Sequence, residues 1–297
     1  MYRLKETEIF FCGLSKNNVN SLTKNIDFIL DFKNKSKYKK INLLFVDSNS
    51  NDGSKDYLNK YSDEFEFFNV IHKDDLSLIN SRIEKIKICR NLCLKFIENN
   101  YKNNSLVYIP LDTDFYLFSK TSPEKLDELI DYVLQMGNNA GIFPVSEPYY
   151  YDIFALRAKR WLNINSQLIV TNLKKYIRVG SFIFNYLFIF RYQLSPKHIE
   201  LKKFTVTSAF GGIGIYNLSN FDLKDKTYDV SKKSKDLYSE HLFFNKYFDY
   251  LEIKTDWVID APKEHILFKS FNYKDKIIYI IKTFKEDFKS FLNYQSN

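Results

Sequence analysis

The chain has 297 residues, 45% of them hydrophobic and 18% aromatic, which is enough apolar material for a sizeable core and too much for a disordered protein. Its formal net charge of +8 favours anionic partners. The lysines are spread along the whole chain, however, and the sequence has no zinc-finger, RRM or helix-turn-helix signature, so we expect no nucleic acid partner.

The cysteines and the N-terminus favour a cytoplasmic protein. Cys12, Cys89 and Cys93 form an odd set without CxxC spacing, and the last two most simply share the inner face of a helix as reduced thiols. Glu6 and Glu8 precede the first apolar run, so the N-terminus lacks the layout of a secretory signal. Reduced thiols favour the cytosol.

Expected strands and helices alternate in the first third of the chain. Continuous apolar runs predict buried strands, and amphipathic runs predict helices. In chain order they are a strand at 8–14, a helix at 20–32, a strand at 41–46, a helix at 54–61, a strand at 67–72, a helix at 82–100 and a strand from Leu106 onwards. This alternation predicts a mainly parallel sheet, whose ligands bind at the carboxyl ends of the strands. Asp47, Asp112 and Asp114 follow such ends.

The second half of the chain is less regular. Strands are expected at 141–157, 205–218 and 255–262, a short helix at 239–248, and a basic amphipathic helix within 271–297. No Pro-, Gly- or Ser-rich linker separates the halves, which predicts one α/β domain over residues 1–270, divided near residue 120, with the helix as an extension. The apolar segment 179–190 is interrupted by Asn185 and is shorter than the ~20 residues that a membrane-spanning helix requires.

The acids Asp112 and Asp114 stand two positions apart where an apolar strand leaves the sheet. Residues i and i+2 of an extended segment point to the same side, so both carboxylates are expected to face one spot and Thr113 to face away. Carboxylate oxygens suit Mg²⁺ or Mn²⁺, and such a cation commonly serves a diphosphate. The alternative is that the two acids simply end a strand in water.

Five short motifs occur in a characteristic order. They are SNDGS (50–54), RIEKIKICRN (82–91), YYDIFALR (150–157), SAFGGIGIY (208–216) and SEHLFFN (239–245). In this order they resemble the CAP59-like mannosyltransferases of capsule biosynthesis, which have the GT-A fold, and more distantly the family 2 glycosyltransferases. The resemblance covers about residues 8 to 265, and Phe154 stands where that family has a tryptophan. It implies a GT-A (Rossmann-like) domain with a mainly parallel central sheet and helices on both faces.

The resemblance also implies an activity and a donor site. The chain would be a metal-dependent hexosyltransferase that moves a sugar from a UDP- or GDP-sugar to a glycan or lipid-linked acceptor in capsule or lipopolysaccharide biosynthesis. Asp47 would contact the nucleoside. Asp112 and Asp114 would hold Mn²⁺ or Mg²⁺ and, through it, the diphosphate. Arg82 and Arg90 would contact the donor, because guanidinium groups suit phosphate oxygens.

Three further polar residues are candidates for the acceptor side and the metal. Asp152 follows aromatic residues that suit sugar faces and could bind sugar hydroxyls, or it could be a buried acid paired with Arg157. By its place in the motif, Glu240 is a candidate base for the acceptor hydroxyl, and the alternative is a first-turn acid behind a Ser239 cap. The resemblance implies that His265 supplies a third metal ligand, although a lone histidine is more often a surface residue.

Two apolar segments favour a position on the inner face of the cytoplasmic membrane. Basic residues flank segment 179–190 on both sides. The C-terminal helix is basic and aligns five apolar residues, namely Ile277, Ile281, Phe284, Phe288 and Leu292. Both features suit an anionic membrane surface. The alternative is that both segments pack inward on the domain.

Two other functions compete with the transferase. A sugar nucleotidyltransferase also combines an α/β fold with metal-binding acids, but it normally has a Gly-rich turn with a following Arg and Lys, which GLSKNNVN (13–20) lacks. The second is a carbohydrate-binding component of a polysaccharide assembly complex, in which Asp112 and Asp114 bind no metal.

Overall fold

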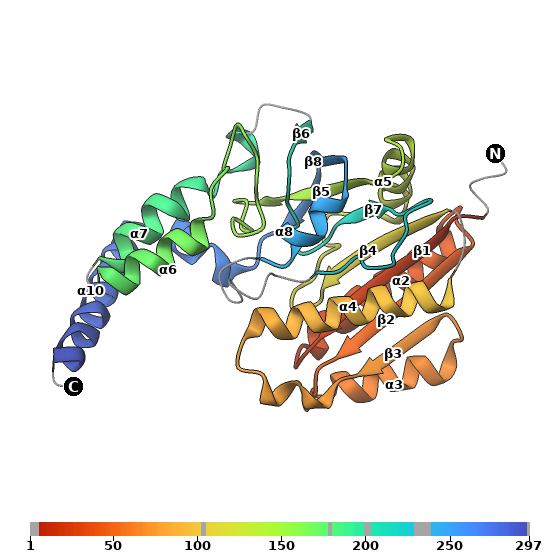
Figure 1. The fold of residues 1–297 in the computed structure, drawn as a ribbon, viewed down its shortest axis with the longest axis horizontal. Helices are drawn as coiled ribbons and strands as arrows, with labels where there is room; N and C mark the ends of the chain where they lie inside the picture. Colours follow the sequence, from red (N-terminus) through yellow and green to blue (C-terminus); the bar gives the residue numbers. More distant parts are fainter. Residues whose placement is uncertain (1–5, 102–104, 178–179, 199–202, 229–238, 296–297) are drawn as a thin grey trace.

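A single mixed β-sheet forms the centre of the molecule (Figure 1). The computed structural model describes residues 6–101, 105–177, 180–198, 203–228 and 239–295, and these contain eight strands in the order β3-β2-β1-β4-β7-β5-β8-β6. The strands are β1 Glu8–Ser15, β2 Lys40–Asp47, β3 Phe68–His72, β4 Leu106–Asp112, β5 Ala140–Glu147, β6 Lys203–Thr205, β7 Ile215–Asn217 and β8 Tyr250–Asp260.

The sheet is mainly parallel, as predicted. β1 pairs in parallel with β2 and β4, β2 with β3, and β5 with β8, whereas β7 and β6 run antiparallel to their neighbours. The register pairs Ser15 with Asp47 and Leu14 with Asp112. The carboxyl ends of β2, β1 and β4 therefore meet at one edge of the sheet, with an aspartate on either side of β1.

Helices cover both faces of the sheet. α2 Val19–Lys35, α3 Ser54–Glu64 and α5 Pro123–Gln135 pack on one face, and α4 Arg82–Asn100 and the short α8 His241–Phe244 pack on the other. β1 is apolar because both faces of the sheet are covered. Ile9 and Phe11 pack in the core under α2, α3 and α5, and Phe10 and Cys12 pack in the core under α4 and α8. The protein therefore has the α/β architecture that the sequence predicts.

The cysteines and one glycine of this region are explained by close packing. Cys12, Cys89 and Cys93 are buried and free, in agreement with the predicted reduced thiols. A Cβ atom on Gly13 would lie 2.3 Å from the ring of Phe45 on the neighbouring strand. β1 therefore requires glycine here because the aromatic ring of β2 crosses it.

Two expected strands are shorter than predicted. The strand expected at 141–157 ends at Glu147, where Pro148 offers no N–H for the β-ladder. The strand expected at 205–218 forms β7 only over Ile215–Asn217, because Gly211 and Gly212 have positive φ angles of 75° and 83° and make a turn. Both corrections turn strand into loop, and both loops reach the edge where β4 ends.

Four α-helices among the described residues were not predicted, and the two longest of them are capped by a side chain. The first is α5, and its signal is present in the sequence: the Ser122 side chain accepts a hydrogen bond from Lys125 N, and Pro123 occupies the first turn. The second is α6 Ser166–Tyr176. It is capped by Asn165, whose side chain accepts a hydrogen bond from Leu168 N.

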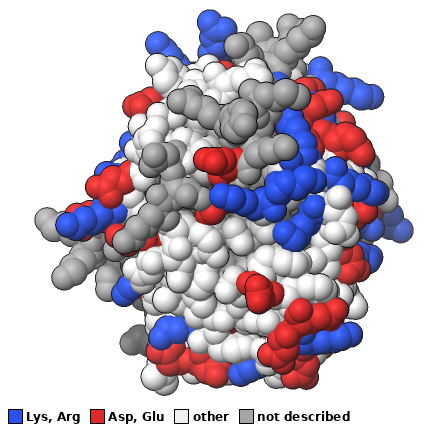
Figure 2. Space-filling view, turned by 90° about the vertical axis from the view of Figure 1, so that its right-hand side faces the viewer, with Lys and Arg blue, Asp and Glu red and all other residues white. Residues whose placement is uncertain are grey.

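A helical extension lies to one side of the sheet (Figure 1). It consists of α6, α7 Ser181–Phe188, α9 Leu267–Ser270 and the C-terminal α10 Tyr273–Gln295. No helix among the described residues is long and apolar enough to cross a membrane. On the opposite side of the molecule, both basic and acidic side chains are exposed among the described residues (Figure 2).

Candidate functional site

The turn after β4 presents two carboxylates to a cavity of about 490 Å³. Asp112 ends the strand, and both Asp112 and Asp114 line the cavity. Thr113 is buried on the other side of the turn, where its Oγ1 donates to Leu14 O and accepts a hydrogen bond from Asn18 Nδ2. The predicted orientation of the two acids and the threonine is thus observed. The threonine fastens the turn to the end of β1.

Arg90 holds Asp112 in place from behind. Its guanidinium Nη2 lies 2.6 Å from Asp112 Oδ1, and Nη1 donates to the carbonyl oxygens of Leu111 and Cys12. The Arg90 side chain is fully buried, whereas the Asp112 side chain keeps 38% of its surface exposed. Arg90 was predicted as a donor contact, but in this conformation it lies beneath the cavity and orients a carboxylate that reaches it.

Arg82 differs from Arg90 in being accessible. Its side chain is 77% exposed, and Nη2 lies 3.9 Å from Asp114 Oδ2, a loose ion pair in water. Arg82 begins α4, so the long side chain extends from the helix start over the acids of the turn. It is an exposed cation beside two carboxylates.

Two more acids line the same cavity. Asp152 accepts hydrogen bonds from the backbone N–H groups of Gly211 (3.0 Å) and Ala155 (3.3 Å). Burial raises the pKa of Asp152, and these two hydrogen bonds oppose the shift. Burial also raises the pKa of Glu240, while the charge of Arg90 opposes that shift and Asp152 adds to it. Glu240 therefore holds its proton more strongly than an ordinary glutamate.

Repulsion among these acids affects Asp112. Its pKa is raised, chiefly by burial, with contributions from the charges of Asp114, Glu240 and Asp152, and Arg90 opposes the shift. Four carboxyl groups on one cavity therefore disfavour full ionisation of the site. A bound cation reverses this effect, because it stabilises the ionised carboxylates.

The loop that carries Gly211 and Gly212 closes the cavity on the side of Asp152. Gly212 O accepts a hydrogen bond from Asp112 N (2.8 Å), so the loop is joined to the end of β4. A Cβ atom on Gly212 would lie 2.6 Å from the Phe115 ring and 2.7 Å from Tyr151 Oη, both of which line the cavity. Glycine is needed here for its positive φ and for this close approach.

Glu240 itself occupies the N-cap position of α8. The alternative with Ser239 as the cap and Glu240 in the first turn places the start of the helix one residue too early. The neighbouring His241 is a cavity residue that was not predicted. The His241 ring stacks on Phe210 at 3.6 Å between centroids, and its Nε2 lies 3.3 Å from Glu240 Oε1. Burial, followed by the charge of Arg90, lowers the pKa of His241 well below its ordinary value, so the ring is neutral.

Other cavity residues were also missed. Phe210 lies inside the motif SAFGGIGIY, but no pattern marks it individually, whereas Tyr151 is one of the aromatic residues before Asp152 that were expected to suit sugar faces. Gln167 and Gln193 come from the helical extension and the segment after it, and they carry no sequence signal at all. Folding alone brings these residues to the cavity.

The predicted metal ligands lie on two sides of the cavity. Asp112 and Asp114 share one turn, while His265 lies at the end of a 3-10 turn, Lys263–His265, with its ring 5.3 Å from that of Tyr151. Within the described residues, no three His, Cys, Asp or Glu side chains converge closely enough to hold an ion. The protein therefore offers two carboxylates at this turn, and His265 as a ligand stays a prediction.

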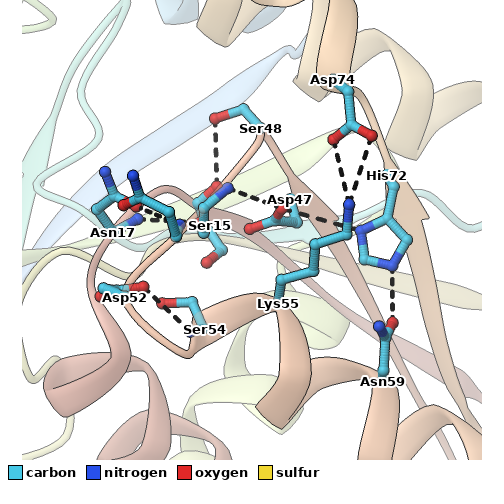
Figure 3. A network of polar contacts seen from close by, with 12 residues as sticks. Ser15, Asn17, Asp47, Ser48, Asp52, Ser54, Lys55, Asn59, His72 and Asp74 are labelled. Carbon is cyan, nitrogen blue, oxygen red and sulfur yellow. Dashed lines mark hydrogen bonds and ion pairs between the residues drawn. The ribbon is translucent and has the colours of Figure 1, made fainter.

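Asp47, at the end of β2, is fully buried and does not line the large cavity. Its Oδ2 accepts a hydrogen bond from Ser50 N (3.1 Å) and lies 3.8 Å from His72 Nδ1, and its Oδ1 has no hydrogen-bond partner. Figure 3 shows His72 between Asp47 and Asn59, with the Asn59 Oδ1 atom 2.7 Å from His72 Nε2. A buried carboxylate oxygen without a partner is costly in a folded protein.

The turns after β1 and β2 are tied to each other (Figure 3). Asn17 contributes twice, because its N–H donates to Ser50 Oγ and its side chain accepts from Asn51 N. Asp52 accepts hydrogen bonds from Val19 N and Ser54 N. The polar residues SKNN and DSNSNDGS therefore form one rigid unit, which explains their composition.

A second cavity, of about 250 Å³, lies beside this unit. Residues at the ends of β1 and β2, among them Ser15, Val46 and Ser48, line one side of it. Arg82, Asp112 and Asp114 line the other side, and they also line the large cavity. The acids of the turn after β4 thus stand where the two cavities meet.

Sequence comparisons assign no family, because no protein-family model and no curated protein matches the chain. Solved structures with a similar arrangement exist. A crystal structure of S. aureus TarS residues 1–349 has 12% identity over 89% of this chain and 63% of that chain, with a TM-score of 0.48. This chain therefore spans less than two thirds of the TarS fragment.

Two other solved structures show a comparable likeness. The mannosyltransferase PcManGT from Pyrobaculum calidifontis, in complex with GDP-Man and Mn²⁺, has 12% identity over 86% of this chain and 57% of its own, with a TM-score of 0.45. The galactosyltransferase LgtC, in complex with donor and acceptor sugar analogs, has 15% identity over 86% and 73%, with a TM-score of 0.42. At these levels of similarity no residue role passes from those proteins to this chain.

Proposed function

We propose that the protein is a metal-dependent glycosyltransferase of the GT-A type, which uses a nucleotide-diphosphate sugar as donor. The observation that carries this proposal is the position of Asp112 and Asp114 at the junction of two cavities, with Arg82 beside them. In this proposal the nucleoside diphosphate lies at the smaller cavity, and the transferred sugar and its acceptor lie in the larger one. The two acids and the arginine then lie at the diphosphate between them.

The residues at the junction fit a hard divalent cation shared with the donor. Asp112 binds Arg90 through Oδ1, which leaves Oδ2 for the cavity, and Asp114 is half exposed. Mg²⁺ and Mn²⁺ are commonly held by one or two carboxylates together with substrate phosphates, so two protein ligands suffice. When bound, such an ion neutralises the diphosphate and assists its departure as a Lewis acid.

The donor half of the site extends over about residues 1–120. Arg82 binds the diphosphate by leaving Asp114, and Arg90 positions Asp112 without touching the donor. The unpartnered Oδ1 of Asp47 accepts a hydrogen bond from an N–H or O–H group of the nucleoside. Because Asp47 is fully buried, this contact requires a rearrangement of the side chains that cover it.

The acceptor half extends over about residues 121–270, which include α6, α7 and α9, and α10 packs on it as the C-terminal part of the helical extension. Tyr151, Phe154 and Phe210 give the large cavity an aromatic wall for sugar faces, and Asp152 binds sugar hydroxyls. Glu240 takes the proton of the attacking hydroxyl, a task for which a raised pKa is suited. The acceptor is a glycan or a lipid-linked glycan of a surface polysaccharide, and the three free cysteines fit the cytoplasm as the place of reaction.

A panel of nucleotide sugars tests this function. The protein is incubated with each UDP- and GDP-sugar and Mn²⁺, and the released nucleoside diphosphate is measured with the chelated protein as control. A glycosyltransferase releases the nucleoside diphosphate by slow hydrolysis of the donor when no acceptor is present. A nucleotidyltransferase instead makes or consumes pyrophosphate, and a carbohydrate-binding protein does neither, so each of these two results contradicts the proposal.

A further inference from the structure

The helical extension exposes an apolar stripe along α10. Its members recur every three or four residues and so share one side of the helix, and they are Tyr273, Ile277, Ile281, Phe284 and Phe288. Their side chains are between 37% and 81% exposed. The alternative that this helix packs its apolar side inward on the domain is therefore wrong for these five residues. The side chain of Leu292, which was predicted to continue the stripe, lies outside the part that the structure describes.

The rotation of α10 is fixed by contacts of residues outside the stripe. Tyr279 packs on Phe268 with 5.6 Å between ring centroids. Asp287 Oδ2 accepts hydrogen bonds from the N–H groups of Gly180 (2.9 Å) and Ser181 (2.7 Å) at the start of α7. Tyr279 faces away from the stripe and Asp287 lies beside it, so the exposed stripe cannot turn toward the domain without breaking these contacts.

Lysines border the stripe on its free side. On a helical wheel with 100° per residue, four lysines come next to the stripe, and the acids Asp275 and Glu286 come after them. The lysines are Lys274, Lys285, Lys289 and Lys282. All four lysines are exposed. An apolar stripe of Ile, Phe and Tyr with Lys beside it is typical of helices that lie in the interface of a membrane.

α7 continues this surface next to the large cavity. Its residues Ile183, Tyr186 and Leu187 are between 40% and 48% exposed, and α7 contacts α10 (Figure 1). Ile189, the residue that ends α7, lines the cavity, as does Gln193. The exposed apolar side chains and the cavity wall therefore lie within one short stretch of chain.

We propose that this surface of α7 and α10 docks the protein on an anionic lipid membrane. Charge complementarity favours an anionic partner, because the sequence from 166 to 192 has basic residues and no acid, and lysines border the α10 stripe. A second copy of the chain is disfavoured, since a symmetric contact would place these lysines against each other. As a consequence that rests on the proposed function, the acceptor is lipid-linked and enters the cavity beside Ile189.

Flotation with vesicles tests the docking. The full chain is mixed with phosphatidylcholine vesicles with or without phosphatidylglycerol, at low and at high salt. We expect binding to the anionic vesicles at low salt, and weaker binding at high salt because salt screens the lysines. Equal binding to neutral vesicles, or no binding to either kind at low salt, would overturn the proposal.

Two sets of variants locate the surface. The double change Ile281→Glu and Phe288→Glu is expected to abolish flotation, while Leu78→Glu, a change at an exposed apolar residue on the 3-10 turn Asp74–Leu78, is expected to leave it unchanged. Replacing Lys274, Lys282 and Lys285 by Gln is expected to weaken binding on the order of 100-fold, at about fivefold for each lysine. Replacing Lys24, Lys60 and Lys95 by Gln is the matched control, since these exposed lysines lie on α2, α3 and α4.

Two further measurements separate membrane docking from self-association and from catalysis. If the stripe joins two copies, the wild type forms a concentration-dependent dimer in sedimentation and the double Glu variant does not, and this result overturns the membrane proposal. Asp114→Asn is expected to float like the wild type, because it lies outside the surface. The lipid result therefore stands even if the proposed sugar transfer fails.

Discussion

Two strands of the same sheet end in an aspartate, and the burial and the partners of the two side chains differ. At the end of β2, Asp47 is fully buried, hydrogen-bonded to its own turn, and has one oxygen without a partner. At the end of β4, Asp112 is fixed from below by Arg90 and keeps part of its side chain on the cavity. The same local pattern thus gives one acid suited to recognition and another suited to holding a cation, and the covering side chains make the difference.

Removing the second acid of the β4 turn should have the largest effect on activity. Asp114→Asn is expected to lower kcat/KM on the order of 10³-fold, because cation binding contributes several kcal/mol to the transition state. The half-exposed side chain contributes little to the core, so the melting temperature should stay unchanged. Steady-state kinetics measures the loss of activity, and thermal denaturation measures the melting temperature. Full activity of the variant, or of the wild type in EDTA, would exclude a role for the metal.

Glu240 tests whether proton transfer takes place at the same cavity as the β4 acids. Glu240→Gln is expected to lower kcat on the order of 10²-fold with little change in KM, if the carboxylate is the base. A base must be ionised, so kcat rises with pH through its pKa, and burial moves this rise above the ordinary range of a glutamate. A pH profile of kcat should lose this limb in the variant. A raised KM with an unchanged kcat would instead make Glu240 an acceptor-binding residue.

The two acids of the β4 turn should differ in their effect on stability. Asp112→Asn weakens the hydrogen bond to the fully buried Arg90 and is expected to lower the free energy of unfolding by about 1 kcal/mol, because relief of the repulsion from Asp114 and Glu240 offsets part of the loss. Asp114→Asn is the matched control, since its loose partner Arg82 is exposed to water. Urea unfolding of both variants measures the difference. Equal stability of the two would contradict the positioning role given to Arg90.

The β2 end should show the smallest effect, and in binding rather than turnover. Asp47→Asn is expected to raise the KM of the nucleotide sugar about tenfold with kcat largely kept, because one hydrogen bond to a charged acceptor is weakened. Lys55→Ala is a control from the same network, where the exposed ion pair with Asp74 contributes little. A loss of kcat in Asp47→Asn would contradict the assignment of Asp47 to donor binding alone.

Much of the first half of the fold follows from its sequence. The apolar runs of β1, β2 and β4 and the amphipathic α2 and α4 are local patterns, and the acids after the strands are at the predicted edge. The spacing of Asp112 and Asp114 also predicted that both carboxylates reach one cavity, although β4 ends at Asp112 and Asp114 already belongs to the turn.

What the sequence did not predict depends on contacts between distant segments. The burial of Arg90 under Asp112 follows from α4 crossing the end of β4, which no local pattern encodes. His241 and Gln193 reach the cavity only through folding of the second half. The rotation of α10 depends on hydrogen bonds from Gly180 and Ser181 to the distant Asp287, so the sequence left open whether its apolar side faces outward or inward.

Titration calorimetry of UDP and GDP in the presence and absence of Mn²⁺ tests the central claim most directly, because it needs neither donor sugar nor acceptor. The claim is that Asp112 and Asp114 hold a divalent cation against a nucleoside diphosphate. We predict that one of the two nucleotides binds in the presence of Mn²⁺, binds much more weakly in EDTA, and binds weakly to Asp114→Asn in both conditions. Binding that is equally tight with EDTA, or with the variant, would contradict the claim.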